Sequence, residues 1–353
     1  MTYHRNNIEI SANPKNLAEI SVIRPILIVL LVVYHAFIIY KGGWTQPMGF
    51  HANKVYWWIA TISYSFMLEM FVFISGYVWA YQVFERKKID TFKQLLGTKF
   101  TRLIIPSIIF SIIYVCLLST KEPLSVTQLT YEILCGYGHM WFLPMLFWCF
   151  IGVYILEKIE IKGEYKLILL LLCSVVSFIP LPLRLSSTMY YIFFFYTGFY
   201  LRKNIAGKSI TISTRSVVAM WLAYLMVFVV LTIVKEYMAE FDTTSIITKA
   251  AIISSSKLCQ IIYAGLGIIA MFSTALIIVS KKQLQPWIIK LGVYCFGVYI
   301  FQQFILMWLY YHTNLPTTVG SQLLPWIGTA IALSGSLFLS WLFRKTKLGR
   351  QLI

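Results

Sequence analysis

Long apolar runs recur along the whole chain, and they constrain its fold more than any other feature. A helix that crosses the hydrocarbon core of a bilayer needs about 20 mostly apolar residues. Ten runs approach that length, at residues 23–40, 57–80, 103–119, 139–157, 167–183, 188–201, 216–234, 258–279, 291–311 and 323–343. With 59% hydrophobic and 12% charged residues, the chain is too apolar for a soluble domain. The sequence therefore predicts an all-α fold, a polytopic bundle of ten transmembrane helices.

Lysine and arginine are distributed unevenly between the two sides of these predicted spans. All but seven of the 30 lysines and arginines lie before residue 25, after residue 343 or in every second loop. The alternate loops hold the other seven: Lys41, Lys54, Lys121, Arg184, Lys235, Lys249 and Lys257. Because cytoplasmic loops carry the excess of positive charge, we expect both termini to be cytoplasmic. The net charge of +17 is then a topological signal, and its dispersal in short blocks argues against a nucleic-acid partner.

No internal repeat, low-complexity tract or separate soluble segment interrupts this pattern. We therefore expect residues 1–353 to form a single transmembrane domain with short cytoplasmic segments at both ends. The six cysteines are scattered through or near the apolar runs, without the spacing typical of a metal or redox site. We expect no metal centre, so the chemistry falls to polar residues in the bundle and its short loops.

Two ionisable residues mark the first predicted span. The stretch IRPILIVLLVVYHAF carries Arg24 near its start and His35 eleven residues further on. Pro25 suits the first turn of a helix, which places Arg24 at the cytoplasmic boundary. Eleven residues make three turns plus roughly 20°, so His35 lies on the same face about 16 Å deeper. A histidine in that position can act as a general base.

A plainer interpretation of the same two residues is a membrane anchor at Arg24 and a helix-to-helix hydrogen bond from His35. Ionisable side chains within spans are costly and usually functional, and here both fall on one helix face. We therefore favour a functional site that includes Arg24 and His35.

Glu69 is a second ionisable residue within a predicted span, at a depth close to that of His35. An isolated carboxylate at that depth tends to be protonated, whereas a neighbouring histidine allows it to stay ionised. We therefore predict a His35–Glu69 pair, in which the carboxylate raises the basicity of the imidazole. The alternative is a neutral Glu69 bonded to a backbone carbonyl of a neighbouring helix.

The segment KFTRLIIP places Lys99 and Arg102 one helical turn apart, just before the third predicted span. Cations at this spacing can bind phosphates, arginine through a bidentate fork and lysine as a point charge. They can equally be topological residues that touch anionic lipid. The residues by themselves leave both interpretations open.

On the opposite side of the membrane, GYGHMWFLPMLFW opens the fourth span with His139 and Trp141. Tryptophan at an interface is usually part of an aromatic belt. A flat apolar face beside a hydrogen-bonding edge also suits a sugar, so we predict His139 and Trp141 as substrate-binding residues. Gln302 and Gln303, within the ninth span, fit hydrogen bonds between helices better than ligand binding.

Taken in order, these motifs resemble the acyltransferase-3 family of bacterial membrane acyltransferases, which acylate hydroxyls of envelope sugars. The resemblance rests on Arg24 and His35 in R-x10-H spacing, then MFVFISGY, KFTRLIIP, GHMWFLPML, FFFYTGFYL, FGVYIFQQ and a basic tail. It covers nearly the whole chain. Two positions depart from the family pattern: Glu69 stands where many members carry proline, and Gln302 where many carry histidine. The roles of these two residues are therefore open.

The resemblance implies an O-acyltransferase of the bacterial inner membrane. The enzyme would move an acyl group, usually acetyl, from cytoplasmic acyl-CoA to a hydroxyl of a surface polysaccharide or lipid-linked sugar. Acyl-CoA would be a donor substrate, not a permanently bound cofactor, with its phosphates held by Arg24, Lys99 and Arg102. His35 would be the general base, with Arg24 as a second catalytic residue. Glu69 is a third candidate catalytic residue because of its predicted pairing with His35, and not because of the resemblance.

We considered one alternative for the mechanism and one for the function. Ser75 is a weaker candidate, as the nucleophile of an acyl-enzyme, because a small residue that packs two helices explains it equally well. A transporter or flippase of glycolipid intermediates would also need buried polar residues. Transporters often show paired halves with matching broken helices, however, and the sequence shows no such symmetry.

Overall fold

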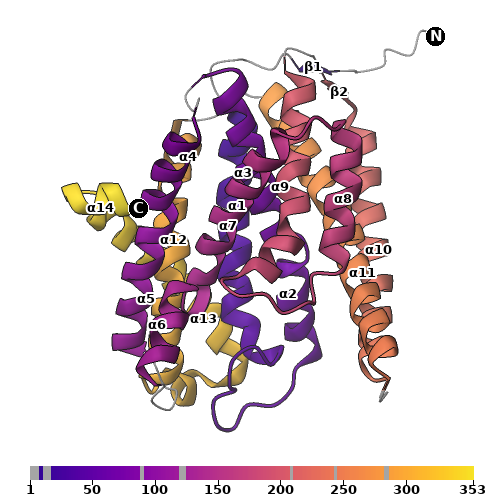
Figure 1. The fold of residues 1–353 in the computed structure, drawn as a ribbon. Coiled ribbons are helices and arrows are strands. Elements are labelled where there is room, and N and C mark those ends of the chain that lie inside the picture. The colour runs from indigo at the N-terminus through magenta and orange to yellow at the C-terminus, as the bar shows by residue number, and fades with distance from the viewer. Residues whose placement is uncertain are drawn as a thin grey trace. The chain divides into compact units, whose positions relative to one another are not determined.

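The computed structural model describes residues 8–10, 17–87, 91–118, 125–206, 210–241, 245–281 and 286–353, which are almost entirely helical (Figure 1). The predicted all-α, polytopic membrane fold is confirmed. Besides helices and loops, the described residues form one short antiparallel pair of strands, β1 (Ile8–Ile10) and β2 (Ile210–Ile212).

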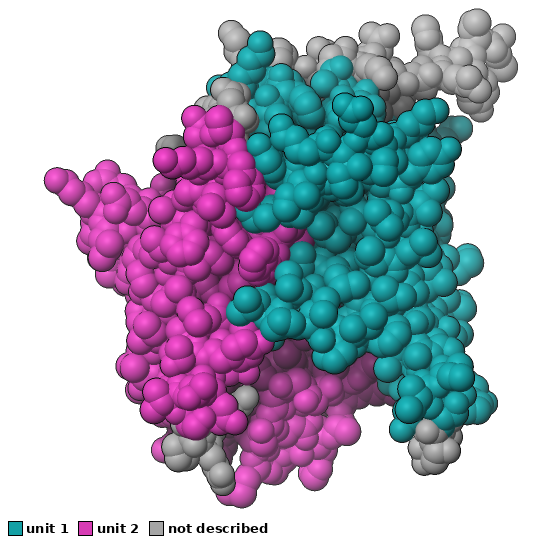
Figure 2. Space-filling view, viewed as in Figure 1, with its two compact units in different colours: residues 1–24, 65–90, 151–289 teal, residues 25–64, 91–150, 290–353 magenta. Residues whose placement is uncertain are grey.

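The chain divides into two compact units, coloured in Figure 2. Unit 1 takes residues 1–24, 65–90 and 151–289, and unit 2 takes residues 25–64, 91–150 and 290–353. The helices α1 (Ala18–Phe37), α7 (Phe142–Glu157) and α12 (Pro286–Tyr311) each contribute to both units. Three helices are thus shared between the two units. The expectation that residues 1–353 form a single domain stays a prediction.

Unit 1 is built around a long contact between two helices. Its complete helices are α3 (Met67–Phe84), α8 (Gly163–Val175), α9 (Leu185–Ile205), α10 (Thr214–Ala239) and α11 (Ile246–Lys281). Helix α3 packs along α9, α9 also packs on α8, and α10 packs on α11.

Two glycines bring α3 and α9 into close contact. A Cβ atom added at Gly76 would lie 1.9 Å from the carbonyl oxygen of Phe195, and one added at Gly198 would lie 2.0 Å from that of Phe73. Both distances are far below van der Waals contact, so a side chain at either position cannot be accommodated without moving a backbone. The motifs MFVFISGY and FFFYTGFYL therefore meet at one helix crossing, and packing explains their glycines.

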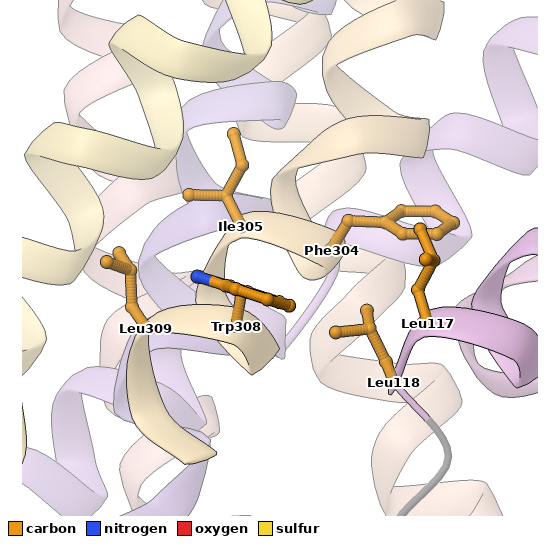
Figure 3. Close-up of a pocket in the computed structure, with 6 residues that line it drawn as sticks. All are labelled: Leu117, Leu118, Phe304, Ile305, Trp308 and Leu309. Atoms are coloured by element: carbon orange, nitrogen blue, oxygen red, sulfur yellow. The ribbon is translucent and has the colours of Figure 1, made fainter. Parts of the chain in front are cut away.

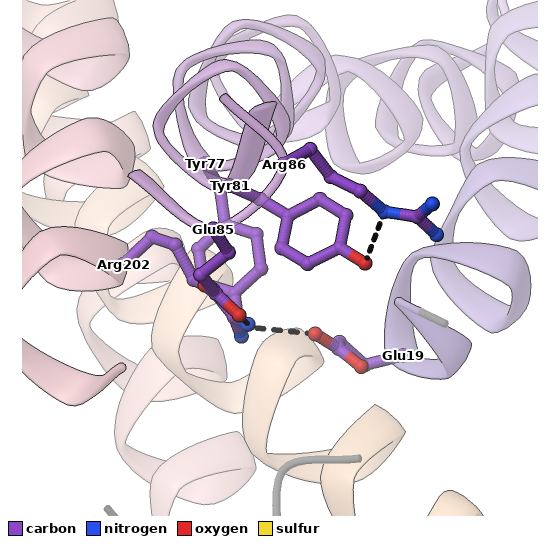
Figure 4. A network of polar contacts seen from close by, with 6 residues as sticks. All are labelled: Glu19, Tyr77, Tyr81, Glu85, Arg86 and Arg202. Carbon is purple, nitrogen blue, oxygen red and sulfur yellow. Dashed lines mark hydrogen bonds and ion pairs between the residues drawn. The ribbon is translucent and has the colours of Figure 1, made fainter. Parts of the chain in front are cut away.

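A polar network ties the start of α1 to α3 and α9 within unit 1 (Figure 4). Its members are Glu19, Tyr77, Tyr81, Glu85, Arg86 and Arg202. The Arg202 guanidinium donates to both carboxylate oxygens of Glu85, at 2.7 and 2.8 Å, and to the hydroxyl of Tyr77 at 3.0 Å. The Tyr77 hydroxyl donates in turn to Glu19 at 3.0 Å. Arg202 is 3% exposed, so this bidentate pair is largely shielded from solvent.

The network also bears on where α1 begins. The helix starts at Ala18, so Pro25 lies inside it and the prediction that Pro25 occupies the first turn is wrong. Glu19 in the first turn favours the earlier start, because it complements the N-terminal end of the helix dipole and is held by Tyr77. The cost is the backbone hydrogen bond that Pro25 cannot donate. Arg24 consequently belongs to the body of α1.

Unit 2 holds most of α12 and the body of α1. Its other helical elements are η1 (Ile38–Tyr40), α2 (Lys54–Tyr64), α4 (Phe92–Lys99), η2 (Phe100–Ile104), α5 (Ile105–Leu118), α6 (Val126–Leu134), η3 (Gly138–Trp141), α13 (Leu315–Phe343) and α14 (Lys347–Leu352). The start of α7 also belongs to this unit.

The segment η2 is a π-helical turn between α4 and α5. Pro106 explains its position, since proline lacks an N–H and its ring crowds the carbonyl of the residue four positions earlier, Arg102. The N–H of Ile105 bonds instead to the carbonyl of Phe100, five residues back. The wider turn thus falls within the KFTRLIIP motif, and π-helical turns of this kind are frequent at functional sites.

Among the described residues, eight helices are long and apolar enough to cross a membrane. They correspond to eight of the ten predicted spans. The fifth and sixth predicted spans are the helices α8, which has 13 residues, and α9, whose tyrosines and hydroxyl residues lower its hydropathy. Since α9 packs between α3 and α8 with Tyr190, Tyr191 and Tyr196 buried, its polar side chains need not face lipid. The count of ten crossings is therefore not confirmed.

Candidate active site

His35 lies near the C-terminal end of α1, in unit 2, and is 8% exposed. Its Nδ1 atom lies 3.1 Å from the side-chain carbonyl oxygen of Gln302, on α12. A hydrogen bond between helices was expected of Gln302, and the structure identifies His35 as its partner. The Gln302 amide nitrogen points the other way, toward the carbonyl oxygen of Tyr299 at 3.5 Å.

This hydrogen bond sets the tautomer of His35. A carbonyl oxygen only accepts, so Nδ1 carries the proton and donates it to Gln302. In a neutral imidazole the other nitrogen, Nε2, then keeps its lone pair. His35 is thereby arranged to accept a proton at Nε2 while Gln302 fixes the orientation of the ring.

His139 lies in η3, with its ring centroid 6.5 Å from that of His35. Its Nε2 atom donates to the carbonyl oxygen of Ile300 at 2.9 Å, and its own carbonyl accepts from the hydroxyl of Tyr299 at 2.6 Å. The Nδ1 atom of His139 is buried and accepts no hydrogen bond from the described residues. Unit 2 thus holds two buried imidazoles, each with one ring nitrogen able to accept a proton or a hydrogen bond.

Aromatic side chains enclose this pair of histidines. The indole of Trp44 stacks on the His35 ring, with centroids 5.9 Å apart and planes within 4°. The ring centroid of Tyr34, the preceding residue of α1, lies 5.2 Å from that of His35. Tyr114 packs against His139 at 6.0 Å. Trp141, predicted as the sugar-binding aromatic, packs against Phe142 at 6.1 Å. The aromatic ring stacked on His35 is that of Trp44, which was not among the predicted site residues.

An apolar groove of about 220 Å³ opens beside these aromatic residues, between α5 and α12 (Figure 3). Its lining consists of Leu117, Leu118, Phe304, Ile305, Trp308 and Leu309. Phe304 also contacts the ring of His139, at 6.0 Å. Because no lining residue is ionisable, the groove suits an apolar group and not the phosphates of a donor.

Lys99 and Arg102 lie at the junction of α4 and η2, in unit 2. The ammonium of Lys99 sits 3.8 Å above the ring of Phe150, while the side chain of Arg102 is exposed. The two cations are close enough to interact electrostatically. The structure therefore brings this basic pair together, whereas its shared use with Arg24 stays a prediction.

Glu69 belongs to unit 1, and it forms its hydrogen bonds there. Its Oε1 atom accepts from the hydroxyl of Tyr190 at 3.1 Å and from the amide of Gln260 at 2.9 Å. His35 finds its partner, Gln302, in unit 2. The predicted pair of His35 and Glu69 stays a prediction. The alternative was a hydrogen bond from Glu69 to a backbone carbonyl, and the hydrogen bonds described here for Glu69 are to the side chains of Tyr190 and Gln260 instead.

Two smaller expectations concern Ser75 and metal binding. The hydroxyl of Ser75 donates to the carbonyl of Phe71 in its own helix, at 2.8 Å, as expected of a small packing residue. Within the described part of the chain, no group of three histidine, cysteine or acidic residues lies close enough to hold a metal ion.

The chain was compared with protein families, curated proteins and solved structures. A family model described as an acyltransferase domain, of the acyltransferase-3 type, matches residues 17–345. No curated protein matches the chain. No solved structure matches it either.

Proposed function

The chain belongs to the acyltransferase-3 family, and on that basis we propose a specific reaction for it. The protein transfers an acyl group, acetyl in the first instance, from acyl-CoA to a hydroxyl of a cell-surface polysaccharide or lipid-linked sugar. It works as a multi-pass protein of the bacterial inner membrane. The observation that supports this proposal best is the His35–Gln302 hydrogen bond, which leaves His35 Nε2 as a base inside unit 2.

The reaction follows from that geometry. Nε2 of His35 takes the proton of the acceptor hydroxyl as its oxygen attacks the thioester carbonyl. The C–S bond of the resulting tetrahedral intermediate breaks, and the thiolate of CoA leaves with the acyl group transferred to oxygen. The imidazolium then returns the proton to the thiolate. Gln302 acts as a positioning residue throughout, because it holds Nδ1–H and so keeps the lone pair on Nε2.

Donor and acceptor use different groups. The phosphates of CoA bind Arg102 and Lys99, with Arg24 of α1 as a third cation. A second hydroxyl of the acceptor sugar donates to the Nδ1 lone pair of His139, and the sugar stacks on an aromatic face, for which Trp44 and Trp141 are the candidates. The predicted role of Glu69 as a partner of His35 is not required for this reaction.

The experiment that tests the function incubates purified protein in nanodiscs with radiolabelled acetyl-CoA and a lysate-derived pool of envelope glycans. Release of CoA and transfer of label to glycan are the expected results. In a parallel assay, the protein is placed in sealed vesicles and the movement of a glycolipid from one leaflet to the other is followed. Such movement without any release of CoA would identify a transporter and would overturn the proposal.

Removing the hydrogen-bond acceptor of Gln302 should slow the reaction. In Gln302→Leu, Nδ1–H loses its partner and the ring its orientation, so we expect kcat to fall about 10- to 100-fold, as when other orienting partners of a histidine are removed. Gln302→Glu supplies an acceptor oxygen at the same chain length and should recover most of the loss. Equal rates for Gln302→Leu and Gln302→Glu would show that Gln302 does not position His35.

The basic pair should govern donor affinity. In Arg102→Ala the guanidinium that binds phosphate is lost, so we expect the KM for acetyl-CoA to rise about tenfold, the effect of one charge-assisted hydrogen bond. Steady-state kinetics with varied acetyl-CoA measure this effect. Lys93→Ala is the matched control, since Lys93 is an exposed cation on the adjoining helix α4. A similar rise in both variants would indicate general electrostatics, not a site.

A further inference from the structure

A second polar cluster lies in unit 1, where four helices meet. It contains Glu69 of α3, Tyr190 of α9, Lys235 of α10, and Lys257, Gln260 and Tyr263 of α11. The acyl transfer proposed above requires none of these residues, although Glu69 was also predicted as a partner of His35. Burying an ionisable group within an apolar helix costs free energy, and such groups are usually functional. The cluster of Glu69, Lys235 and Lys257 is therefore a candidate for a second site.

The carboxylate of Glu69 is only partly satisfied. Its residue is fully buried, and its Oε1 atom accepts two hydrogen bonds, from Tyr190 and Gln260. The other oxygen, Oε2, is buried and accepts none from the described residues. A buried carboxylate oxygen without a donor is unfavourable, and native structures rarely retain one. Oε2 is therefore placed to accept a hydrogen bond from a bound hydroxyl.

Two ammonium groups flank this carboxylate. Lys235 donates to the hydroxyl of Tyr263 at 3.2 Å, and the Lys257 ammonium lies 4.6 Å above the ring of Tyr190. Both lysines also interact electrostatically with Glu69. Each ammonium has three protons to donate, and the partners named here use only part of that capacity. Lys235, Lys257 and Gln260 are half-buried, so part of each of these side chains reaches the protein surface, whereas Glu69 is fully buried behind them.

From these contacts we infer that the Glu69–Lys235–Lys257 cluster is a binding site for a phosphate ester that carries a nearby hydroxyl. The phosphate takes the two lysines, which bind phosphates as point charges. The hydroxyl donates to Oε2 of Glu69. A soluble sugar phosphate and the glycerol-phosphate headgroup of a phospholipid share this chemistry. The site does not rest on the acyl transfer proposed above, because that reaction is carried by His35 and Gln302 and requires none of the residues of the cluster.

Binding is measured on the full-length protein in phosphatidylcholine nanodiscs, with no acyl-CoA present. One arm titrates glucose 1-phosphate, with glucose and inorganic phosphate as comparisons, by isothermal calorimetry. The other arm adds phosphatidylglycerol to the nanodiscs and counts retained lipids by native mass spectrometry. We expect saturable binding in at least one arm. The arm in which it occurs shows whether the ligand is a soluble sugar phosphate or a phospholipid. Absence of saturable binding in both arms would overturn the inference.

Charge variants test the two lysines. We expect Lys235→Met and Lys257→Met each to weaken binding about tenfold, the loss for one hydrogen bond to a charged group. The matched control is Lys249→Met, which removes an exposed cation from the same helix as Lys257 and should bind like the wild type. An equal loss in Lys249→Met would mean that only overall charge attracts the anion, which would contradict a built site. Circular dichroism melts confirm that each variant is folded.

The Glu69→Gln variant tests the hydroxyl contact. The wild type should prefer glucose 1-phosphate, or phosphatidylglycerol, to inorganic phosphate, and this preference should shrink in Glu69→Gln because the amide offers a weaker acceptor. An unchanged preference would remove Glu69 from the site. His35→Ala should bind as the wild type does, so loss of acyl transfer and loss of this site are distinguishable.

Discussion

Replacing His35 by alanine is expected to abolish acyl transfer while leaving the protein folded and inserted in the membrane. The imidazole is the proposed general base, and loss of such a base lowers the rate by about 100- to 10,000-fold. The ring is held by one hydrogen bond to Gln302 and by stacking with Trp44, so its removal leaves the packing of α1 largely in place. Release of CoA from acetyl-CoA in the presence of acceptor measures the effect.

The matched control for this variant is His51→Ala. His51 is an exposed histidine of the same unit, in the loop before α2. Its replacement should leave the rate unchanged. Wild-type activity in His35→Ala would exclude His35 as the base, and loss of folded protein in that variant would show that its role is structural. Melting temperature and size-exclusion behaviour distinguish these outcomes.

The largest effect on stability is expected at the crossing of α3 and α9. In Gly76→Ala or Gly198→Ala the new methyl group would meet a backbone carbonyl about 2 Å away, the approach that the glycines permit. Overpacking of a helix contact typically costs 1–3 kcal/mol, and here the obstacle is rigid backbone, so we expect about 3 kcal/mol or more. The result should be a markedly lower melting temperature and a poor yield of monodisperse protein.

Gly265→Ala provides the control for both variants. Gly265 lies within α11 of the same unit, and a Cβ atom there would meet nothing within 4 Å. Alanine is also the better helix former, so this variant should be as stable as the wild type or slightly more so. If Gly76→Ala and Gly265→Ala melted at the same temperature, the close crossing of α3 and α9 would be wrong.

The membrane fold and the family were predictable because they depend on local properties of the sequence. Apolar runs of membrane-spanning length identify helices wherever they occur, and eight of ten such predictions correspond to suitable helices. The two exceptions, α8 and α9, show the limit of that signal. A helix covered by protein can carry tyrosines and hydroxyl residues that would be unfavourable against lipid, as Tyr190 and Tyr196 do in α9.

The partners of the ionisable residues were harder to predict, because each hydrogen bond joins residues far apart in sequence. His35 and Glu69 were paired on predicted depth alone. Depth does not determine which helix faces which, and the structure gives His35 the amide of Gln302 and Glu69 the side chains of Tyr190 and Gln260. The aromatic partner of His35 was missed for a similar reason. Trp44 follows the span in a short loop, where tryptophan is ordinarily an interface residue.

The sequence by itself determined that this chain is a helical membrane protein of the acyltransferase-3 family, and it singled out His35, Glu69 and the basic pair Lys99 and Arg102. Apolar length and helical periodicity identify the spans and the helix faces, since both act over a few turns of chain. The ordered set of motifs carries the resemblance to the family. Only the tertiary structure decided which groups act on these residues. It set the tautomer of His35 through Gln302. It also brought Lys235 and Lys257 close enough to Glu69 for electrostatic interaction, because long-range helix packing brings those side chains together.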